Sequence, residues 1–315
     1  MSEAACEQRL FLLGHPVGHS KSPAMYNALY AWLGLPWRYD LMDCATDEEA
    51  RGFLQARDFL SVNVTTPYKP HAFEAATARA ASAKLAQGAN LLVRKDDALI
   101  AYNTDGQGCV AFLERAGVDF AGARVAVCGT GPTALAIVHA TALAGADEIV
   151  LLGRDKQRCR AVLETYVRDF GTLAHATIDL PAADDGRRSF REAFEDTAFK
   201  FGSYATSTQA ISAADVVVNA TPLGMGAGDP APFDPALFRP GQTAFDVVYG
   251  HGDTAFLAGA RDAGCCALDG SGMLVGQAVV TAQTVCDIAG APLAPSFDEL
   301  FAFMADAAGF SLPAA

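Results

Sequence analysis

Two short polar segments contain groups that could exchange a proton with a bound substrate. Residues 63–70 end an apolar, strand-like run and hold Lys69 between two prolines, and residues 103–106 end another such run and hold Asp105. An ammonium group beside a carboxylate can stabilise negative charge on a substrate oxygen and exchange a proton with it. Two simpler interpretations stay open, because a loop lysine is commonly solvated and Asp105 also suits the N-cap of the helix expected after it.

A third polar segment, residues 14–23, combines two glycines and two prolines with the hydroxyl groups of Ser20 and Ser22. It precedes a helix expected from Ala24 to about Leu33, for which Ser22 and Pro23 suit the N-cap and the first helical position. Ser20 lies two residues before that cap and has no capping role in this interpretation. Two hydroxyls together with helix N–H groups would form a small binding site for a carboxylate.

A glycine-containing turn is the strongest candidate for a cofactor site. The apolar run from Val125 to Cys128 predicts a buried parallel strand, and a helical pattern begins directly after the turn. Gly129 allows the tight turn, Gly131 lets a pyrophosphate approach the backbone, and Ala134 lets helix and strand pack closely. The N-terminus of the helix adds N–H groups that favour an anion. We therefore expect a dinucleotide site formed by Gly129, Thr130, Gly131, Pro132, Thr133 and Ala134.

The next expected strand, Glu148 to Leu152, ends where a dinucleotide-binding fold meets the adenosine ribose. Gly153 stands where an NAD site usually has a carboxylate, and two arginines follow, Arg154 and Arg158. Guanidinium groups can bind a 2′-phosphate through charge and paired hydrogen bonds. This pattern favours NADP as the cofactor, and NAD stays possible because Asp155 could bind the ribose if its side chain turned inward.

The composition argues against several classes of protein. The chain has 315 residues, of which 51% are apolar and 19% charged, which is typical of a folded protein long enough for two domains. Its net charge of −13 argues against nucleic acid and anionic membrane surfaces as partners. No apolar run reaches the roughly 18 residues that a membrane span needs, and the N-terminus lacks the pattern of a secretory signal.

The cysteine and histidine spacings indicate a cytoplasmic protein without a metal site. The eight cysteines form no C-x-x-C pair and lie mostly in apolar runs, as buried reduced thiols do. The six histidines show no metal-binding spacing, so we expect no metal. The sequence leaves open whether the protein is a monomer or a homodimer, and whether the adjacent Cys265 and Cys266 are redox-active.

Strand and helix patterns alternate along the chain and predict two α/β domains. In the first domain, three strands alternate with helices and imply a parallel sheet: Arg9 to Leu13, Trp37 to Leu41 and Phe59 to Val64. One helix is expected from His71 to Leu85. The second domain follows the doubly wound, Rossmann-type pattern, with a charged and irregular insertion at about 181–210 in which we find no chemistry. The expected division is a substrate-binding and catalytic domain at 1–105 plus 270–315 and a dinucleotide-binding domain at 106–269.

Taken in order, these strand ends resemble those of the shikimate dehydrogenase family, NADP-linked oxidoreductases of the pathway to the aromatic amino acids. The resemblance runs from about Leu10 to Gln277, and six motifs in the family's order are far more specific than one. The motifs are Gly14-x-Pro-x-x-His-Ser-x-Ser-Pro23, Asn63-Val-Thr-x-Pro-x-Lys69, Asn103-Thr-Asp-Gly106, Asn219-Ala-Thr-Pro-Leu-Gly-Met225, Asp246-x-x-Tyr249 with Thr254, and Gly272-Met-Leu-x-x-Gln277.

The resemblance implies a role for each matching residue. Lys69 and Asp105 would form the acid/base pair at the ring hydroxyl whose oxidation converts shikimate to 3-dehydroshikimate. The serines and the tyrosine would bind the substrate's carboxylate, and the other polar residues its ring, in a set formed by Ser20, Ser22, Asn63, Thr65, Asn90, Tyr249 and Gln277. Further contacts to the cofactor would come from Thr221, Met225 and Met273.

Several positions depart from the family's pattern. Pro132 offers no N–H to a pyrophosphate, Gly153 and Asp155 replace two side chains that usually form hydrogen bonds, and Ala282 and Val285 replace aromatic residues of the last motif's helix. Two alternatives therefore stay open: a quinate or quinate/shikimate dehydrogenase that uses NAD, and a non-catalytic nucleotide-binding regulator. A cofactor-free binding module conflicts with the glycine turn and the arginine pair.

Overall fold

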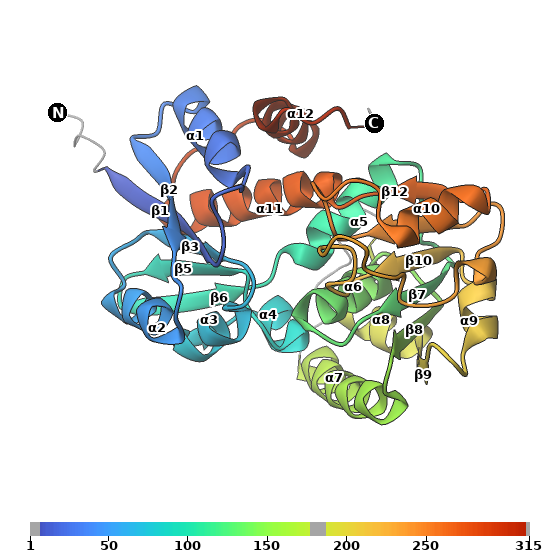
Figure 1. The fold of residues 1–315 in the computed structure, drawn as a ribbon. Coiled ribbons are helices and arrows are strands. Elements are labelled where there is room, and N and C mark those ends of the chain that lie inside the picture. Colours follow the sequence, from blue (N-terminus) through green and yellow to red (C-terminus); the bar gives the residue numbers. More distant parts are fainter. Residues whose placement is uncertain (1–6, 177–186, 313–315) are drawn as a thin grey trace. The chain divides into compact units, whose positions relative to one another are not determined.

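The computed structural model describes residues 7–176 and 187–312 of the chain (Figure 1). Its contacts form two compact units: the residues up to Gly108 together with those from Leu274 onward, and Cys109–Met273. Each unit is built on one six-stranded sheet.

The chain passes from one unit to the other within two helices, α5 (Asp105–Arg115) and α11 (Ser271–Ala289). The domain boundaries expected from the sequence, after residues 105 and 269, lie a few residues before these points. Among the described residues, α11 is also the one helix whose length and composition would allow it to cross a membrane, and 61% of its apolar stretch is buried inside the structure.

The sheet of the first unit is mixed, so the expected parallel sheet is correct only in part. In the order β2-β1-β3-β5-β6-β4, β1 is parallel to β2 and β3, but β5 is antiparallel to both of its neighbours. The reason is local, because β5 and β6 are joined by a two-residue turn at Asp96 (φ 52°) and Asp97, which makes a hairpin. The strands are Gln8–Gly14 (β1), Trp37–Asp43 (β2), Ser61–Val64 (β3), Ala78–Arg79 (β4), Leu91–Lys95 (β5) and Ala98–Tyr102 (β6).

The single helix expected from 71 to 85 is wrong: two short helices, α3 (Lys69–Ala75) and α4 (Ala81–Ala86), flank strand β4. Alanine favours a helix locally, but Thr77 donates its N–H (2.9 Å) and its hydroxyl (3.2 Å) to the carbonyl of Leu99 in β6. The Leu99 N–H donates back to the Thr77 hydroxyl at 2.8 Å. These bonds to a distant strand keep the segment extended. The unit's other helices are α1 (Ser22–Trp32), α2 (Asp47–Ala56) and α12 (Phe297–Ala308).

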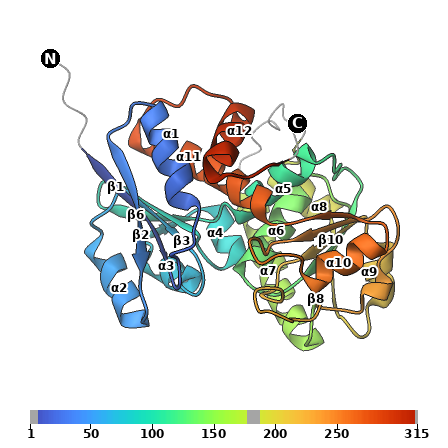
Figure 2. The same cartoon turned by 45° about the horizontal axis from the view of Figure 1, so that its top comes forward.

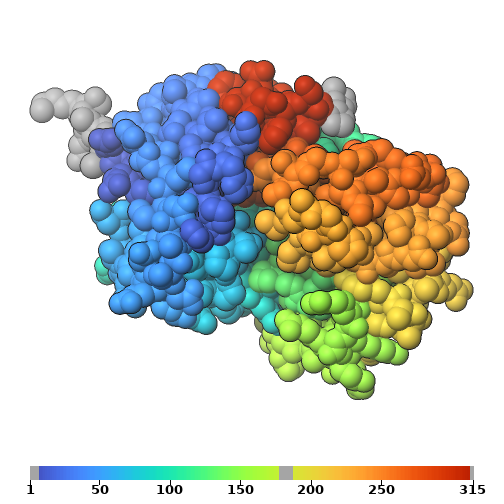
Figure 3. All heavy atoms as spheres, viewed as in Figure 1, coloured from blue at the N-terminus to red at the C-terminus, as the bar shows by residue number. Residues whose placement is uncertain are grey.

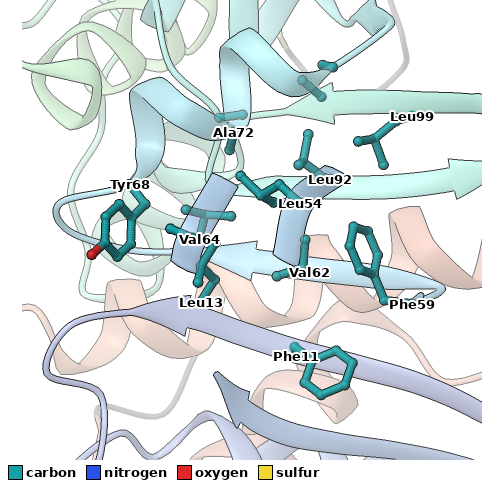
Figure 4. Close-up of a cluster of buried hydrophobic side chains, with 14 of the residues drawn as sticks. Phe11, Leu13, Leu54, Phe59, Val62, Val64, Tyr68, Ala72, Leu92 and Leu99 are labelled. Atoms are coloured by element: carbon teal, nitrogen blue, oxygen red, sulfur yellow. The ribbon is translucent and has the colours of Figure 1, made fainter. Parts of the chain in front are cut away.

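The two faces of this sheet differ in character. Along β3, Val62 and Val64 point to the face that α2 and α3 cover, where they pack with Phe11 and Leu54 in an apolar core (Figure 4). Asn63 lies between the two valines in sequence and therefore points to the opposite face, toward α11. The alternation of β3 thus directs a polar side chain inward, just before the strand ends.

Helices α1 and α12 lie side by side on this second face (Figures 2 and 3). Trp32 of α1 stacks on Phe303 of α12, with ring centroids 4.4 Å apart. Tyr26 of α1 stacks on Tyr39 of β2 at the same centroid distance. These aromatic contacts fix α1, and with it the serine segment at its start, against the sheet.

The second unit confirms the expected Rossmann-type sheet. All six strands are parallel, in the order β12-β11-β10-β7-β8-β9, so the chain reverses its direction of travel across the sheet beside β7. The strands are Arg124–Cys128 (β7), Glu148–Gly153 (β8), Ala198–Ser203 (β9), Val216–Asn219 (β10), Thr243–Asp246 (β11) and Cys266–Leu268 (β12). The helices are Pro132–Leu143 (α6), Lys156–Ala176 (α7), Phe190–Asp196 (α8), Thr208–Ala213 (α9), Pro235–Leu237 (η1) and Ala255–Asp262 (α10).

The insertion expected at about 181–210 is more regular than the sequence suggests, although its first residues, 181–186, lie outside the described part of the chain. From residue 187 it forms α8 and the edge strand β9. A capping box, in which Ser189 and Glu192 bond each other's backbone N–H groups, starts α8. Phe190 and Phe194 then pack against Phe170 of α7. Capping and aromatic packing thus order this segment.

Candidate active site

The two groups proposed for proton exchange meet in the first unit. Lys69 is the first residue of α3 and Asp105 the first residue of α5, and Lys69 Nζ donates a hydrogen bond to Asp105 Oδ2. Strands β3 and β6 run in the same direction, because β5 between them is antiparallel to both, so the segments that follow them start at the same sheet edge. The two side chains are only 16% and 8% exposed, so water screens this ion pair weakly.

Asn90 binds the second oxygen of the Asp105 carboxylate. Its amide Nδ2 donates to Asp105 Oδ1 at 2.8 Å and to Thr104 Oγ1 at 2.9 Å, and its Oδ1 accepts the N–H of Thr104 at 2.8 Å. The N–H of Asp105 donates to Asn103 Oδ1 at 3.1 Å, which fixes the start of α5. The carboxylate therefore has a partner on each oxygen and a fixed direction toward Lys69.

The serine segment and the segment of Thr65 lie against each other at the end of β1. The N–H of Thr65 donates to Leu13 O at 2.9 Å, and the N–H of His15 donates to Thr66 O at 3.2 Å. A Cβ atom on Gly14 would lie 2.4 Å from the Thr65 side chain, so only glycine allows this approach. The two segments, far apart in sequence, form one surface.

The capping roles expected at the start of α1 are wrong. Lys21 is the N-cap residue and Ser22 the first helical residue, while the Ser22 N–H donates to Ser20 Oγ at 3.2 Å. Ser20, for which no such role was expected, therefore accepts a backbone N–H at this helix start. The correction keeps both hydroxyls at the N-terminus of α1, where the helix dipole favours an anion.

Gln277 is placed by an unusually close contact between two helices. A Cβ atom on Gly108 of α5 would lie 2.2 Å from the backbone nitrogen of Gln277 in α11, so the helices touch backbone to backbone there. The Gln277 amide donates to Leu274 O at 2.8 Å. Because Asp105 lies one turn before Gly108, this contact fixes Asp105 and Gln277 on adjoining helices.

In the second unit, the glycine turn has the geometry that a pyrophosphate site needs. Gly129 has a φ of +124°, and a Cβ atom there would lie 2.8 Å from Ala220 O. Gly131 is the N-cap residue of α6, and a Cβ atom on it would meet nothing within 4 Å, so its backbone faces open space. Pro132 is the first helical residue, a position at which a backbone N–H would have no partner inside the helix. Ala134 is buried. The turn therefore fits a dinucleotide phosphate.

The end of β8 shows why no carboxylate follows the strand directly. A Cβ atom on Gly153 would lie 2.7 Å from Cys159 Sγ, so the packing of α7 requires glycine there. Asp155 Oδ1 accepts the N–H groups of Gln157 (2.8 Å) and Arg158 (3.3 Å), which commits this carboxylate to the start of α7. These contacts turn Asp155 toward its own helix, away from the ribose-binding role that would have favoured NAD.

The two arginines expected at a 2′-phosphate lie near the glycine turn. Arg158 Nε donates to Thr130 Oγ1 at 3.3 Å, which joins the start of α7 to the turn after β7. Both Arg154 and Arg158 are exposed, so their guanidinium groups face solvent and are accessible to an anion. The positive charge of Arg158 therefore borders the turn, and Arg154 directly follows β8.

The ends of β10 and β11 carry a polar network whose hydrogen bonds were not expected from the sequence motifs. Asn219 Nδ2 donates to Asp246 Oδ1 at 3.0 Å, and Thr254 Oγ1 donates to Asp246 Oδ2 at 2.7 Å. Burial raises the pKa of Asp246, against the effect of these hydrogen bonds. Thr221 Oγ1 donates to Asn219 Oδ1 at 2.6 Å, so this expected cofactor contact is held by the network. The motifs contain these four residues, but their spacing does not show that the side chains bond to one another.

Asp229 is a further polar residue of this region, and it belongs to none of the sequence motifs. Its Oδ2 accepts the N–H groups of Gly224 (3.0 Å) and Gly226 (2.9 Å), the neighbours of Met225 on either side. Met225 is 51% exposed, whereas Met273 is buried. The carboxylate of Asp229 thus holds an exposed apolar side chain in place on the loop after β10.

Tyr249, the remaining expected substrate contact, follows β11 in the second unit and is partly buried, which raises its pKa. The expected set is therefore divided between the units. The acid/base pair, the serine segment, Asn63, Thr65, Asn90 and Gln277 belong to the first unit, and Tyr249 lies with the cofactor residues.

Comparisons with known proteins identify a known domain in the first unit. Residues 12–92 match the sequence model of the shikimate dehydrogenase substrate binding domain. The chain is 36% identical over 269 residues to the shikimate dehydrogenase (NADP(+)) of Moorella thermoacetica, which covers 84% of this chain and 83% of that protein. It is 34% identical to the protein of the same name from Rubrobacter xylanophilus, with 85% and 87% covered.

Solved structures show the same fold. Shikimate 5-dehydrogenase from Thermus thermophilus, in complex with NADP(H) and shikimate, has a TM-score of 0.73 and 25% identity, with 95% of this chain and 99% of that chain covered. The 5-ketofructose reductase of a Gluconobacter species has a TM-score of 0.71 at 25% identity, with 97% and 99% covered. The fold thus serves more than one named activity, and sequence identity over most of both chains decides the family: this chain belongs to the shikimate dehydrogenases.

Proposed function

We propose that this protein is an NADP-dependent shikimate dehydrogenase that interconverts shikimate and 3-dehydroshikimate. The observation that carries the proposal is the ion pair of Lys69 and Asp105, held by Asn90 in the unit that contains the match to a substrate binding domain. In this proposal the first unit binds and converts the substrate, and the second unit binds NADP.

The acid/base pair suits the proton transfer of this reaction. NADP, when bound, supplies the acceptor for the hydride that leaves the ring carbon. Lys69 donates a hydrogen bond to the oxygen on that carbon and stabilises its developing negative charge, while Asp105 orients the ammonium group. Lys69 passes one proton to the Asp105 carboxylate and accepts the hydroxyl proton in its place, so that the pair as a whole gains one proton. In the reverse direction the same pair returns the proton.

The polar residues around the pair suit a small carboxylic acid with several hydroxyl groups. Ser20 and Ser22 bind the carboxylate at the N-terminus of α1, and Tyr249 contributes from the second unit. The ring is bound by Thr65 and Gln277, and Asn90 and Asn63, whose side-chain amides bond to neighbouring residues, support this site.

NADP is bound by the glycine turn and the arginines. The backbone of residues 129–134 receives the pyrophosphate, and Arg154 and Arg158 bind the 2′-phosphate. Three further residues contact the cofactor. Thr221 and Met225 lie in the loop after β10, and Met273 lies in the first turn of α11. The position of Asp155 at the start of α7 supports NADP over NAD.

We place the enzyme in the cytoplasm, as a monomer or homodimer whose ligands are small molecules rather than nucleic acid or membrane. Six cysteines in the described part of the chain are free thiols, which suits a reducing compartment: Cys44, Cys128, Cys159, Cys265, Cys266 and Cys286.

The test is the steady-state oxidation of shikimate and of quinate, each with NADP and with NAD, followed by the absorbance of the reduced nicotinamide. We expect the highest kcat/KM for shikimate with NADP. A preference for quinate or for NAD would assign the chain to quinate oxidation instead. Absence of turnover in all four combinations would favour a nucleotide-binding regulator.

A further inference from the structure

Behind the proposed acid/base pair, a row of buried hydroxyl and amide groups connects the sheet of the first unit to α11. Asn63 Nδ2 donates to Thr281 Oγ1 at 3.3 Å, and Thr281 Oγ1 lies 3.3 Å from Thr104 Oγ1. Thr104 in turn pairs with Asn90. Thr281 is 1% exposed and belongs to none of the six sequence motifs.

Either hydroxyl can be the donor in the bond between Thr281 and Thr104, and one choice makes the hydrogen bonds of this row run in one direction. Asn90 uses one amide hydrogen on Thr104 Oγ1 and the other on Asp105 Oδ1, and its Oδ1 accepts the Thr104 hydroxyl at 3.3 Å. With the Thr104 hydroxyl donating to Asn90, Thr281 is the donor to Thr104 and the acceptor from Asn63. Each group therefore fixes the orientation of the next, from Asn63 to the carboxylate of Asp105.

The far end of the row is closed as well. Asn63 donates its second amide hydrogen toward Asn90 O at 3.4 Å, and its Oδ1 accepts the Tyr39 hydroxyl at 3.0 Å. Both amide hydrogens of Asn63 are thus used inside the unit. This accounting favours support of the site, rather than donation to substrate, as the main work of Asn63.

We propose that Thr281 is a positioning residue for the acid/base pair, acting through Thr104 and Asn90; the inference rests on the proposed function. Loss of the Thr281 hydroxyl leaves Asn63 and Thr104 each without one buried partner, and the Thr104 hydroxyl is then held less firmly against the Asn90 amide. Asp105 and Lys69 shift relative to the substrate oxygen. Displacements of this kind lower turnover more than they lower binding.

The first test compares Thr281→Val, which keeps the shape and removes the hydroxyl, with Thr284→Val one turn along α11. The Thr284 hydroxyl donates to Val280 O within the helix and is a matched control. We expect kcat for shikimate with NADP to fall about tenfold in Thr281→Val, with KM for NADP nearly unchanged, and the pH profile of kcat to move. Thr281→Ser should restore kcat to within about twofold, because serine keeps the hydroxyl. Equal kcat values and pH profiles for the Thr281→Val and Thr284→Val enzymes would overturn the proposal.

A second measurement does not depend on turnover. Trace acetylation with acetic anhydride, read by mass spectrometry, gives the reactivity of Lys69 relative to the exposed Lys84 in the same molecule. In Thr281→Val we expect this ratio to rise about threefold, since Asp105 is held less firmly against Lys69. An unchanged ratio would contradict the proposal that Thr281 positions the pair. If the wild-type protein did not turn over shikimate, the proposed function would be wrong. The acetylation ratio would still test whether Thr281 positions Lys69 and Asp105.

Discussion

The candidate sites of the two units are formed by different kinds of chemical groups. In the first unit the site consists of side chains that are buried and bonded to one another, as in the set of Lys69, Asp105 and Asn90. In the second unit it consists of a backbone turn with an open face at Gly131 and of exposed arginines. The comparison teaches that changes in the first unit should act on turnover, whereas changes around the turn should act on cofactor affinity.

The largest effect is expected for Lys69→Ala. The substitution removes the charge that stabilises the developing alkoxide, so kcat should fall about 10²-fold or more while the fold is kept. Steady-state kinetics and thermal unfolding measure the two quantities. Lys84→Ala, at an exposed position of α4, is the control and should behave as wild type. Wild-type turnover in Lys69→Ala would show that the lysine takes no part in the mechanism. It would also contradict the expectation that changes in the first unit act on turnover.

A buried histidine of the second unit lies outside both candidate sites, so its replacement should change stability but neither turnover nor cofactor affinity. His139 of α6 packs edge-on against Phe170 and Phe190, and burial lowers its pKa from 6.5 to about 4. The unfolded chain therefore binds a proton that the folded chain does not, so stability is full above pH 6.5 and is lost as the pH falls toward 4.

We expect this loss to be about 2.5 kcal/mol between pH 6.5 and pH 4. Urea titrations of the wild type and of His139→Leu, followed by circular dichroism, give the difference in the free energy of unfolding at each pH. The difference should change by this amount in favour of the variant as the pH falls. A difference that does not depend on pH would show that the histidine has the same pKa in the folded and the unfolded chain.

Arg154→Ala should act on cofactor binding. Removal of one guanidinium from the 2′-phosphate should raise KM for NADP about tenfold, with kcat and KM for NAD changed much less. Arg160→Ala is a matched control, since Arg160 is exposed on α7 and pairs with Glu164 of the same helix. Equal effects of Arg154→Ala on the two cofactors would mean that Arg154 does not touch the 2′-phosphate.

The smallest effect is expected for Asp229→Ala, which removes the acceptor of two backbone N–H groups beside Met225. The loop should become mobile and KM for NADP should rise about threefold, which corresponds to the loss of about one net hydrogen bond. Asp234→Ala removes a similar loop cap at Ala236 and is the control. If kcat fell while KM stayed constant, the loop would act on turnover and the division between the units would fail.

Local patterns in the sequence predicted the elements better than their pairing. The glycine turn at 129–134 and the helix directly after it appear where they were expected, because their signals lie within a few residues. The strand at 78–79 and the mixed strand directions of the first sheet were not predicted, since strand direction and edge pairing depend on partners elsewhere. Thr77 illustrates this, because its bonds to Leu99 override an alanine-rich helical pattern.

The same limit applies to the site. The residue types and their motifs identified Lys69, Asp105 and Asn90 as candidates, but not that Asn90 binds the carboxylate of Asp105. Thr281 could not be found at all from spacing, because its partner Asn63 is 218 positions away in the chain. A hydrogen-bond network across a sheet leaves no periodic signal in the sequence.

The most direct test of the central claim follows the hydride itself. Shikimate carrying deuterium on the ring carbon that becomes the carbonyl is incubated with NADP and the wild-type enzyme, and the reduced cofactor is analysed by mass spectrometry. We predict reduced NADP that carries one deuterium, formed at a rate that drops about 10²-fold or more in Lys69→Ala. Reduced cofactor without deuterium, or equal rates in the two enzymes, would contradict hydride transfer assisted by this pair.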